Sequence, residues 1–320
     1  MTTRRFLALA GSVLLLSLGL VGLASPAGAV HVTCGQTILV TTVLDANVGP
    51  CATGLTIGAS NITLDLNGFT ISGNPGAGED AGITLDGRTG VTVKNGTVTL
   101  FDAGVAVLGG SANTVVSMKV VDNRGSGANF GDGIALFSSD RNRVLNNEVR
   151  NNGPYDGIGM ITANFNVIDG NRVTDNNQSA SNTAGIRIEN AGRVASNDNV
   201  ITNNQVTNSG IYGIEVFAGG SRNQIRSNQV LFNALDGITV FAGGNDNVIE
   251  GNNVRGNRGQ GIFVRAAAGS FPAPAGNQIL RNVSFGNTSS DLRDGQPTCG
   301  TNQWHGNLGG TGTPPCVFNP

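Results

Sequence analysis

Charged side chains, histidine and aromatic rings are all scarce in this 320-residue chain. Only 12% of residues are charged, which excludes a fold that depends on ion-pair networks or amphipathic helices. With two His and three Met, the chain lacks the imidazole and soft sulfur ligands that a copper site requires. It also lacks GxSxG, HExxH, Walker A and dinucleotide-binding motifs, so serine-hydrolase, zincin and nucleotide chemistry are unsupported.

Long hydrophobic runs are nearly absent as well. The single one extends from Phe6 to Leu23, follows Arg4 and Arg5, and precedes the small residues 27–29. This order is typical of a secretory signal peptide, which we predict at residues 1–29. No second run of about 18 apolar residues follows, so we expect an exported protein, extracellular or in the cell envelope, without a membrane partner.

The charge balance gives no sign of a nucleic-acid partner. Without Arg4 and Arg5 the chain has 17 basic and 21 acidic residues, a net charge of −4. A weakly acidic and evenly mixed surface does not attract phosphate groups.

Four cysteines can oxidise in an exported chain, and their positions favour one of the three possible pairings. Cys34 and Cys51 lie near the predicted mature start, and Cys299 and Cys316 lie near the end. We expect two local disulfides that fix the two ends of the structure, and no metal at either pair.

Glycine and asparagine are abundant, and they recur in a repeat. The stretch from Asp236 to Asn257 combines an x-Gly-Ile turn, which has Val in place of Ile after Ala103-Gly104, with Asn-x-Ile-x-x-Asn-x-Val-x-x-Asn. The turn recurs every 22 to 29 residues, which predicts a solenoid. Its x residues are Ala81, Ala103, Asp132, Asp156, Ala184, Tyr212, Asp236 and Gln260.

Branched apolar residues alternate with polar ones inside each repeat, as in short strands that bury one face. The pattern predicts an all-β, single-domain parallel β-helix of about ten coils. We assign residues 30–57 to an N-terminal cap, 58–287 to the repeats and 288–320 to a C-terminal cap, with Trp304 covering the last coil. The middle asparagine of each repeat is expected to stack in a buried column and to take the left-handed bend itself. These residues are Asn147, Asn171, Asn204, Asn228, Asn252 and Asn282.

The repeats resemble those of secreted right-handed parallel β-helix proteins, a group that includes NosD-like proteins, polysaccharide lyases and mannuronan epimerases. LDLNGFTISG at 64–73 and the DGI…N-x-I-x-x-N-x-V units carry the resemblance, and DLRDGQPTCGTNQWHGN at 291–307 is similar to the closing segment of uncharacterised members. The resemblance implies a protein that binds an extracellular polysaccharide, with an acidic polymer among the candidates. If the protein is an enzyme, lyase or hydrolase chemistry is implied.

The family's catalytic motifs are only partly present. Tyr212-Gly213-Ile214-Glu215-Val216-Phe217 is similar to an epimerase motif but has Phe217 in place of its histidine. Asp132 and Asp156 share a turn position on consecutive coils, where stacked carboxylates lie about 5 Å apart, near the separation of a retaining glycosidase pair. The alternative is that both carboxylates bind the backbone of the next turn.

One outward-facing strip collects the remaining candidates. Arg187 and Glu215 are expected side by side, as the alternative catalytic pair to Asp132 and Asp156. Aromatic rings beside such groups can bind sugar. The candidate substrate-binding residues are Glu189, Tyr212, Phe217, Asp236, Phe241, Phe263 and Arg265.

Three alternatives remain open at this stage. The insertions at 176–183 and 268–276 could cover the strip, and Arg187 and Glu215 would then form an ordinary ion pair. The whole protein could also be a non-catalytic structural or adhesive cell-surface β-helix. No cofactor is expected, although Ca²⁺ between the stacked aspartates is open, and the sequence predicts no oligomeric state.

Overall fold

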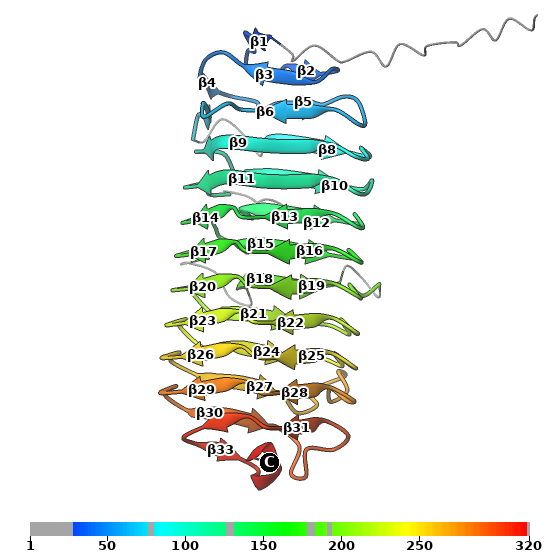
Figure 1. The fold of residues 1–320 in the computed structure, drawn as a ribbon, viewed down its shortest axis with the longest axis vertical. Coiled ribbons are helices and arrows are strands. Elements are labelled where there is room, and N and C mark those ends of the chain that lie inside the picture. The colour runs from blue at the N-terminus through cyan, green and yellow to red at the C-terminus, as the bar shows by residue number, and fades with distance from the viewer. Residues whose placement is uncertain (1–27, 76–79, 126–130, 178–182, 191–193, 319–320) are drawn as a thin grey trace, which may run out of the picture.

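A computed structural model describes residues 28–75, 80–125, 131–177, 183–190 and 194–318. Short parallel strands stack coil upon coil along one axis, from the N-terminal coil to the C-terminal cap (Figure 1). Nearly all of the predicted signal peptide lies outside the described residues. Within them, no helix is long and apolar enough to cross a membrane.

One side of the solenoid is a twelve-stranded parallel sheet with one strand from each coil. The strands are β2 (Thr37–Ile38), β5 (Leu55–Ile57), β8 (Ala81–Asp86), β10 (Ala103–Leu108), β12 (Ile134–Phe137), β15 (Ile158–Ile161), β18 (Ala184–Glu189), β21 (Tyr212–Val216), β24 (Ile238–Val240), β27 (Gln260–Val264), β30 (Ser290–Asp294) and β33 (Gly312–Thr313).

The other two sides form a 21-stranded sheet, because β9 and β11 run continuously around the corner between them. One side holds β1 (Ala29–Val30), β3 (Thr42–Leu44), β6 (Thr63–Asp65), β13 (Arg143–Leu145), β16 (Val167–Asp169), β19 (Val200–Thr202), β22 (Gln224–Arg226), β25 (Val248–Glu250), β28 (Gln278–Leu280) and β31 (Gln303–His305). The next side holds β4 (Val48–Cys51), β7 (Thr70–Gly73), β14 (Glu148–Arg150), β17 (Arg172–Thr174), β20 (Gln205–Thr207), β23 (Gln229–Leu231), β26 (Asn253–Arg255), β29 (Val283–Phe285) and β32 (Leu308–Gly309). The two shared strands are β9 (Thr92–Thr99) and β11 (Thr114–Val121), and the one described helix is the 3₁₀ turn η1 (Pro315–Phe318).

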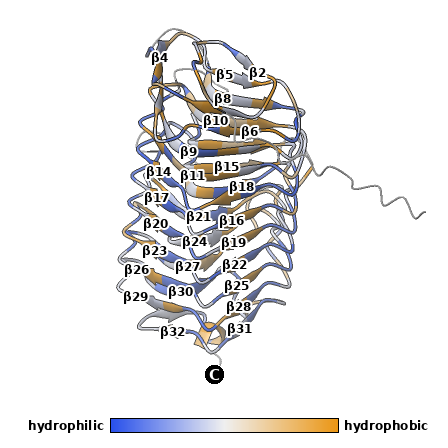
Figure 2. Cartoon of the chain, turned by 45° about the horizontal axis from the view of Figure 1, so that its top comes forward, coloured by the Kyte–Doolittle hydropathy of each residue, from blue (hydrophilic) through white to orange (hydrophobic). Residues whose placement is uncertain are grey.

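The core consists of the predicted columns of branched side chains. Val144, Ile168 and Ile201 lie in direct register and are fully buried, as are Val149 and Val173 on the next side. Hydrophobic residues recur in the strands of successive coils (Figure 2). Because a parallel ladder places equivalent residues above one another, each column packs at the same depth through the stack.

Asparagines form hydrogen-bonded ladders beside this core. The predicted middle column is buried, and Asn204 Nδ2 donates to Asn228 Oδ1 at 3.0 Å while Asn228 Nδ2 donates to Asn252 Oδ1 at 3.0 Å. Two further ladders flank it, one including Asn223 and Asn247 and the other Asn233. The amide-to-amide hydrogen bonds run toward the C-terminal coil, while Asn204 Nδ2 and Asn228 Nδ2 each also donate to a backbone carbonyl of the preceding coil, at Ile168 and Ile201.

The predicted left-handed bend at the middle asparagines is wrong. Positive φ occurs one residue earlier, at Asn146, Asn203 and Ser227 with φ of 53°, 55° and 55°, and at Gly170 and Gly251 with 67° and 63°. The bend at that residue leaves the following asparagine free to point its amide into the corner of the coil. The side chain then bonds to backbone and to the next amide instead of stabilising its own backbone.

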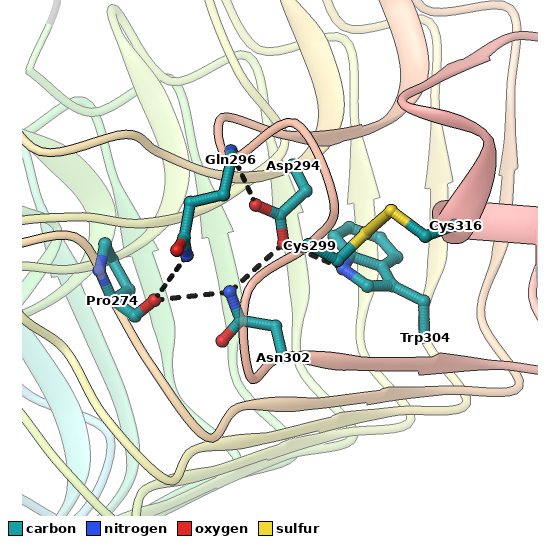
Figure 3. The surroundings of a disulfide bond; sticks show 7 residues. All are labelled: Pro274, Asp294, Gln296, Cys299, Asn302, Trp304 and Cys316. Atoms are coloured by element: carbon teal, nitrogen blue, oxygen red, sulfur yellow. Dashed lines mark hydrogen bonds between the residues drawn. A yellow bond between two sulfur atoms is a disulfide. The ribbon is translucent and has the colours of Figure 1, made fainter.

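Both predicted disulfides are present, Cys34–Cys51 and Cys299–Cys316. Trp304 in β31 is 2% exposed, and its Nε1 donates to Asp294 Oδ2 at 3.0 Å beside the C-terminal disulfide (Figure 3). Asn302, the last member of one ladder, donates to the same oxygen at 3.1 Å. Another ladder ends where Asn287 Nδ2 donates to Asp291 Oδ1 at 2.9 Å. Two ladders therefore terminate on carboxylates, which accept hydrogen bonds and have no donor left to satisfy.

Candidate functional site on the twelve-stranded sheet

The register of the twelve-stranded sheet brings the predicted strip together. Gly159 pairs with Arg187, Arg187 with Glu215, and Glu215 with Thr239, so these positions form one column along β15, β18, β21 and β24. Thr239 pairs in turn with Phe263 on β27. We call this column, together with the neighbouring residues Asp132, Asp156, Glu189, Tyr212, Asp236 and Arg265, the charged face.

Arg187 is the centre of the charged face. Its Nη1 lies 2.8 Å from Glu189 Oε2, and its Nε lies 2.8 Å from Glu215 Oε2. Neither Arg187 Nε nor Glu215 Oε2 has a hydrogen-bond partner among the described residues. Their contact is therefore an ion pair without hydrogen-bond geometry. Burial lowers the pKa of Arg187, but the charges of Asp156, Glu215 and Glu189 outweigh this and raise it, so the guanidinium stays charged.

The acidic partners of Arg187 are held in a poorly solvated environment. Glu215 is 3% exposed, and burial raises its pKa although Arg187 and Arg265 lower it. Burial also raises the pKa of Glu189, against the opposing effect of Arg187. Both carboxyl groups therefore hold protons more tightly than they would in water.

Asp132 and Asp156 each accept a hydrogen bond from the backbone of the next turn, which is the alternative to a catalytic role that the sequence left open. Asp132 Oδ1 accepts from the backbone N–H of Asp156 at 2.9 Å, and Asp156 Oδ1 accepts from that of Ala184 at 2.6 Å. Burial raises the pKa of Asp132 to about 7, with Glu189 also raising it, while the Asp156 N–H and Arg187 lower it. Burial likewise raises the pKa of Asp156, with Arg187 opposing and Asp132 adding to the shift.

The two candidate pairs are parts of one cluster. The charges of Arg187 and Glu189 act on both aspartates, so Asp132 and Asp156 belong to the same electrostatic neighbourhood as Arg187 and Glu215. Gly159 lies between them, and a Cβ at this position would be 3.1 Å from Asp132 Oδ1 and 3.5 Å from Asp156 Oδ2. Sequence reasoning treated the pairs as alternatives, whereas the structure joins them.

A second arginine organises the C-terminal part of the charged face. Arg265 Nη2 donates to Tyr212 Oη and to Asp236 Oδ2, both at 3.0 Å. Asp236 also accepts from the Gln260 N–H at 2.8 Å and from Thr239 Oγ1 at 3.1 Å. Burial raises the pKa of Tyr212, so its phenol remains a neutral hydrogen-bonding group.

Aromatic rings flank the charges. The Phe217 and Phe241 centroids are 5.6 Å apart, and Phe271 completes a triangle at 6.0 and 6.2 Å. Phe271 belongs to the insertion between β27 and β28 and is 42% exposed, while Phe217 and Phe241 are half-buried. This insertion adds a ring to the strip and leaves part of the aromatic surface open. The other insertion, at 176–183, lies largely outside the described residues.

Phe263 and Arg293 continue the strip toward the C-terminal cap. The guanidinium carbon of Arg293 lies 4.9 Å from the Phe263 ring centroid, and that of Arg265 lies 5.2 Å from it. The sequence-based strip missed Phe271 and Arg293. Phe271 sits in an irregular insertion, where no repeat column could predict its position, while Arg293 follows the aligned column one coil beyond Phe263.

A model of the family described as right handed beta helix region matches residues 53–230 and 182–307. The chain belongs to this family. A search of curated proteins finds no match.

Solved structures share the fold of this β-helix protein at low sequence identity. The catalytic domain of a GH87 α-1,3-glucanase in complex with nigerose is 16% identical with a TM-score of 0.54, covering 87% of this chain and 64% of that one. The Dettilon tailspike protein is 15% identical with a TM-score of 0.53, covering 82% and 52%. Tailspike protein 2 from Escherichia coli O157:H7 bacteriophage CAB120 is 13% identical with a TM-score of 0.52, covering 86% and 42%. This chain therefore spans about half to two thirds of the first two structures and less of the third.

The β-helix protein has no ready metal centre in its described part. No group of three or more His, Cys, Asp or Glu residues is arranged there to hold an ion. Calcium between Asp132 and Asp156 stays an untested prediction. The charged face presents carboxyl groups and guanidinium groups beside aromatic rings.

Proposed function

We propose that this β-helix protein is secreted and binds an extracellular polysaccharide along the charged face, from Arg187 to Arg265. One observation carries the proposal: half-exposed rings of Phe217 and Phe241 lie beside charged groups that fixed ion pairs hold in place. Sugar rings stack on aromatic faces, and their hydroxyls bond to carboxylate and guanidinium groups. Binding needs little side-chain ordering here, because the ion pairs restrict these groups beforehand.

Two further features support the proposal. The predicted signal peptide and the two disulfides agree with an oxidising, extracellular environment. One protein of similar fold, the catalytic domain of the α-1,3-glucanase, is seen in complex with nigerose. This likeness concerns the fold, so the residues of the charged face carry the argument.

A polysaccharide array with the labelled protein tests the proposal. We expect binding to at least one polymer and its loss in the double variant Phe217→Ala and Phe241→Ala. Phe165→Ala is the matched control, because Phe165 is an exposed ring under Arg141 outside the twelve-stranded sheet. Binding to no polymer would reject the proposal and favour a structural or adhesive role.

Polysaccharide hydrolysis is the second candidate function, and the carboxyl groups favour it. With a pKa raised to about 7, Asp132 holds a proton near neutral pH, as a general acid for glycosidic oxygen must. Glu189 is the most accessible carboxyl group of the cluster, with 21% of its side chain exposed, and burial raises its pKa while the charge of Arg187 opposes that shift. In this candidate mechanism Asp132 protonates the leaving oxygen and Glu189 acts as base or nucleophile.

Product analysis separates the candidates. New reducing ends that disappear in Asp132→Asn, with binding retained, would support hydrolysis, whereas products with unsaturated-sugar absorbance would indicate elimination instead. Binding without any product would reject the enzymatic candidate and leave the binding function.

A further inference from the structure

Both arginines of the charged face, Arg187 and Arg265, already form ion pairs with carboxyl groups of the protein. Arg187 contacts Glu189 and Glu215 at 2.8 Å each, and Arg265 contacts Asp236 at 3.0 Å. Recognition of a uronate carboxylate usually requires a guanidinium or ammonium group with free donors. A uronate here would have to compete with carboxylates that ion pairs already hold in place.

The balance of charge on this face is negative. Three carboxyl groups, Glu189, Glu215 and Asp236, pair with two arginines, and the nearby Asp132 and Asp156 bind their protons more tightly because burial raises their pKa values. Arg293, the next cation along the strip, lies at its C-terminal end against Phe263. Another negative charge brought beside these groups would be repelled, and the low solvation of the cluster weakens screening of that repulsion.

The accessible part of the face suits an uncharged sugar. Phe217, Phe241 and Phe271 present three neighbouring rings. Beside these rings, 21% of the Glu189 side chain and 26% of the Arg265 side chain are exposed. Glu189 can therefore accept a hydrogen bond from a sugar hydroxyl, and Arg265 can donate one. Together these groups offer stacking and hydrogen bonding, and the one cation among them, Arg265, is already paired with Asp236.

We infer that the charged face selects neutral polysaccharides, built of uncharged hexose units, and rejects polyuronates. The inference rests on the proposed function and departs from the acidic polymer that the family resemblance includes among the candidates. Phe271 becomes a binding residue, and Glu189 becomes the residue that determines charge specificity.

Calorimetric titration with matched probes tests this inference. The probes are α-1,3-linked and β-linked neutral gluco-oligosaccharides, oligogalacturonate and alginate oligosaccharide, at low and physiological salt. We expect at least one neutral probe to bind at least about tenfold more tightly than either uronate. Phe271→Ala should weaken this binding by about tenfold, while its exposed position leaves folding unaffected.

Glu189→Gln tests directly whether the negative charge of Glu189 excludes uronates. It removes one negative charge and the partner of Arg187 Nη1, so uronate affinity should rise by about tenfold and the rise should diminish with salt. Glu148→Gln, the same change beside Arg150 and Arg172 on the 21-stranded sheet, should leave uronate affinity unchanged. Thermal unfolding of each variant confirms that it is folded.

The outcomes distinguish this inference from the proposed function. Tighter binding of a uronate by the wild-type protein, or no gain in Glu189→Gln, would overturn neutral selection and leave polysaccharide binding intact. Absence of binding to every probe and every arrayed polymer would overturn both.

Discussion

Asp132 accepts a hydrogen bond from the backbone N–H of Asp156, one coil further along the solenoid, at 2.9 Å. Asp156 in turn accepts from Ala184 on the following coil at 2.6 Å. The two carboxyl groups thus link three successive turns at the edge of the charged face. They also carry raised pKa values, so this part of the scaffold is sensitive to pH.

Asp132→Asn should change how stability depends on pH. Burial raises the pKa of Asp132 from 3.8 to about 7, so the folded state binds this proton more tightly than the unfolded state. The resulting stabilisation is complete below about pH 4 and is lost as pH rises through about 7, a change of up to about 4 kcal/mol. Asparagine retains an oxygen for the Asp156 N–H but does not titrate, so the loss should be smaller in the variant.

Urea denaturation between about pH 4 and pH 8 measures this difference. Asp86→Asn, an exposed aspartate at the end of β8, is the control and should follow the wild-type profile. Parallel profiles for Asp132→Asn and wild type would mean that Asp132 does not titrate differently in the folded protein.

Asp294→Ala should destabilise the C-terminal cap more than Asp294→Asn. Alanine leaves the buried Trp304 Nε1 without its acceptor, removes one of two acceptors of Asn302 and frees the Gln296 N–H. We expect a loss of about 2–4 kcal/mol in the free energy of unfolding, because unsatisfied buried donors are costly. Asparagine retains one acceptor oxygen and should lose less. Equal losses in the two variants, by urea denaturation, would show that the negative charge is what matters.

The repeat pattern predicted the scaffold because a parallel stack repeats its register at every coil. Once Ile168 and Ile201 are aligned in the sequence, their pairing and burial follow, and so does the contact between Arg187 and Glu215. Both cysteine pairs were predicted on a different ground, the closeness of their members in sequence at the two ends of the chain. The sequence pattern therefore specifies the backbone arrangement that positions the charged face.

The repeat pattern did not predict which side chains interact across coils, nor where the irregular insertions lie. The register places Arg187 beside Glu215, but it does not say that the charge of Arg187 also acts on Asp156 on the preceding coil. Phe271 comes from an insertion without repeat symmetry, so its contact with Phe217 could not be read from a column. The left-handed bend was placed one residue late because asparagine suits both the bend and the buried ladder, and the pattern alone does not separate these two roles.

Replacing Cys299 and Cys316 together by Ser should weaken the cap without unfolding the coils. The disulfide closes a loop with a sequence separation of 17, for which chain entropy gives about 3 kcal/mol. We expect a fall of this size in the free energy of unfolding, and increased hydrogen exchange in β31 and η1. Protection in β16 and β19, several coils away, should remain unchanged. A uniform loss of protection would show that the cap holds the whole stack together.

Asn228→Ala should be among the most destabilising substitutions in the scaffold. Asn228 Oδ1 accepts from both the backbone N–H and the Nδ2 of Asn204, and its Nδ2 donates to Ile201 O and Asn252 Oδ1. Alanine leaves these buried partners unsatisfied, so we expect a loss of about 3–5 kcal/mol by urea denaturation. Asn253→Ala removes a side chain that accepts from the exposed Arg255, and it should lose less than about 0.5 kcal/mol. Similar losses in the two variants would mean that the buried ladder contributes no more to stability than a surface hydrogen bond.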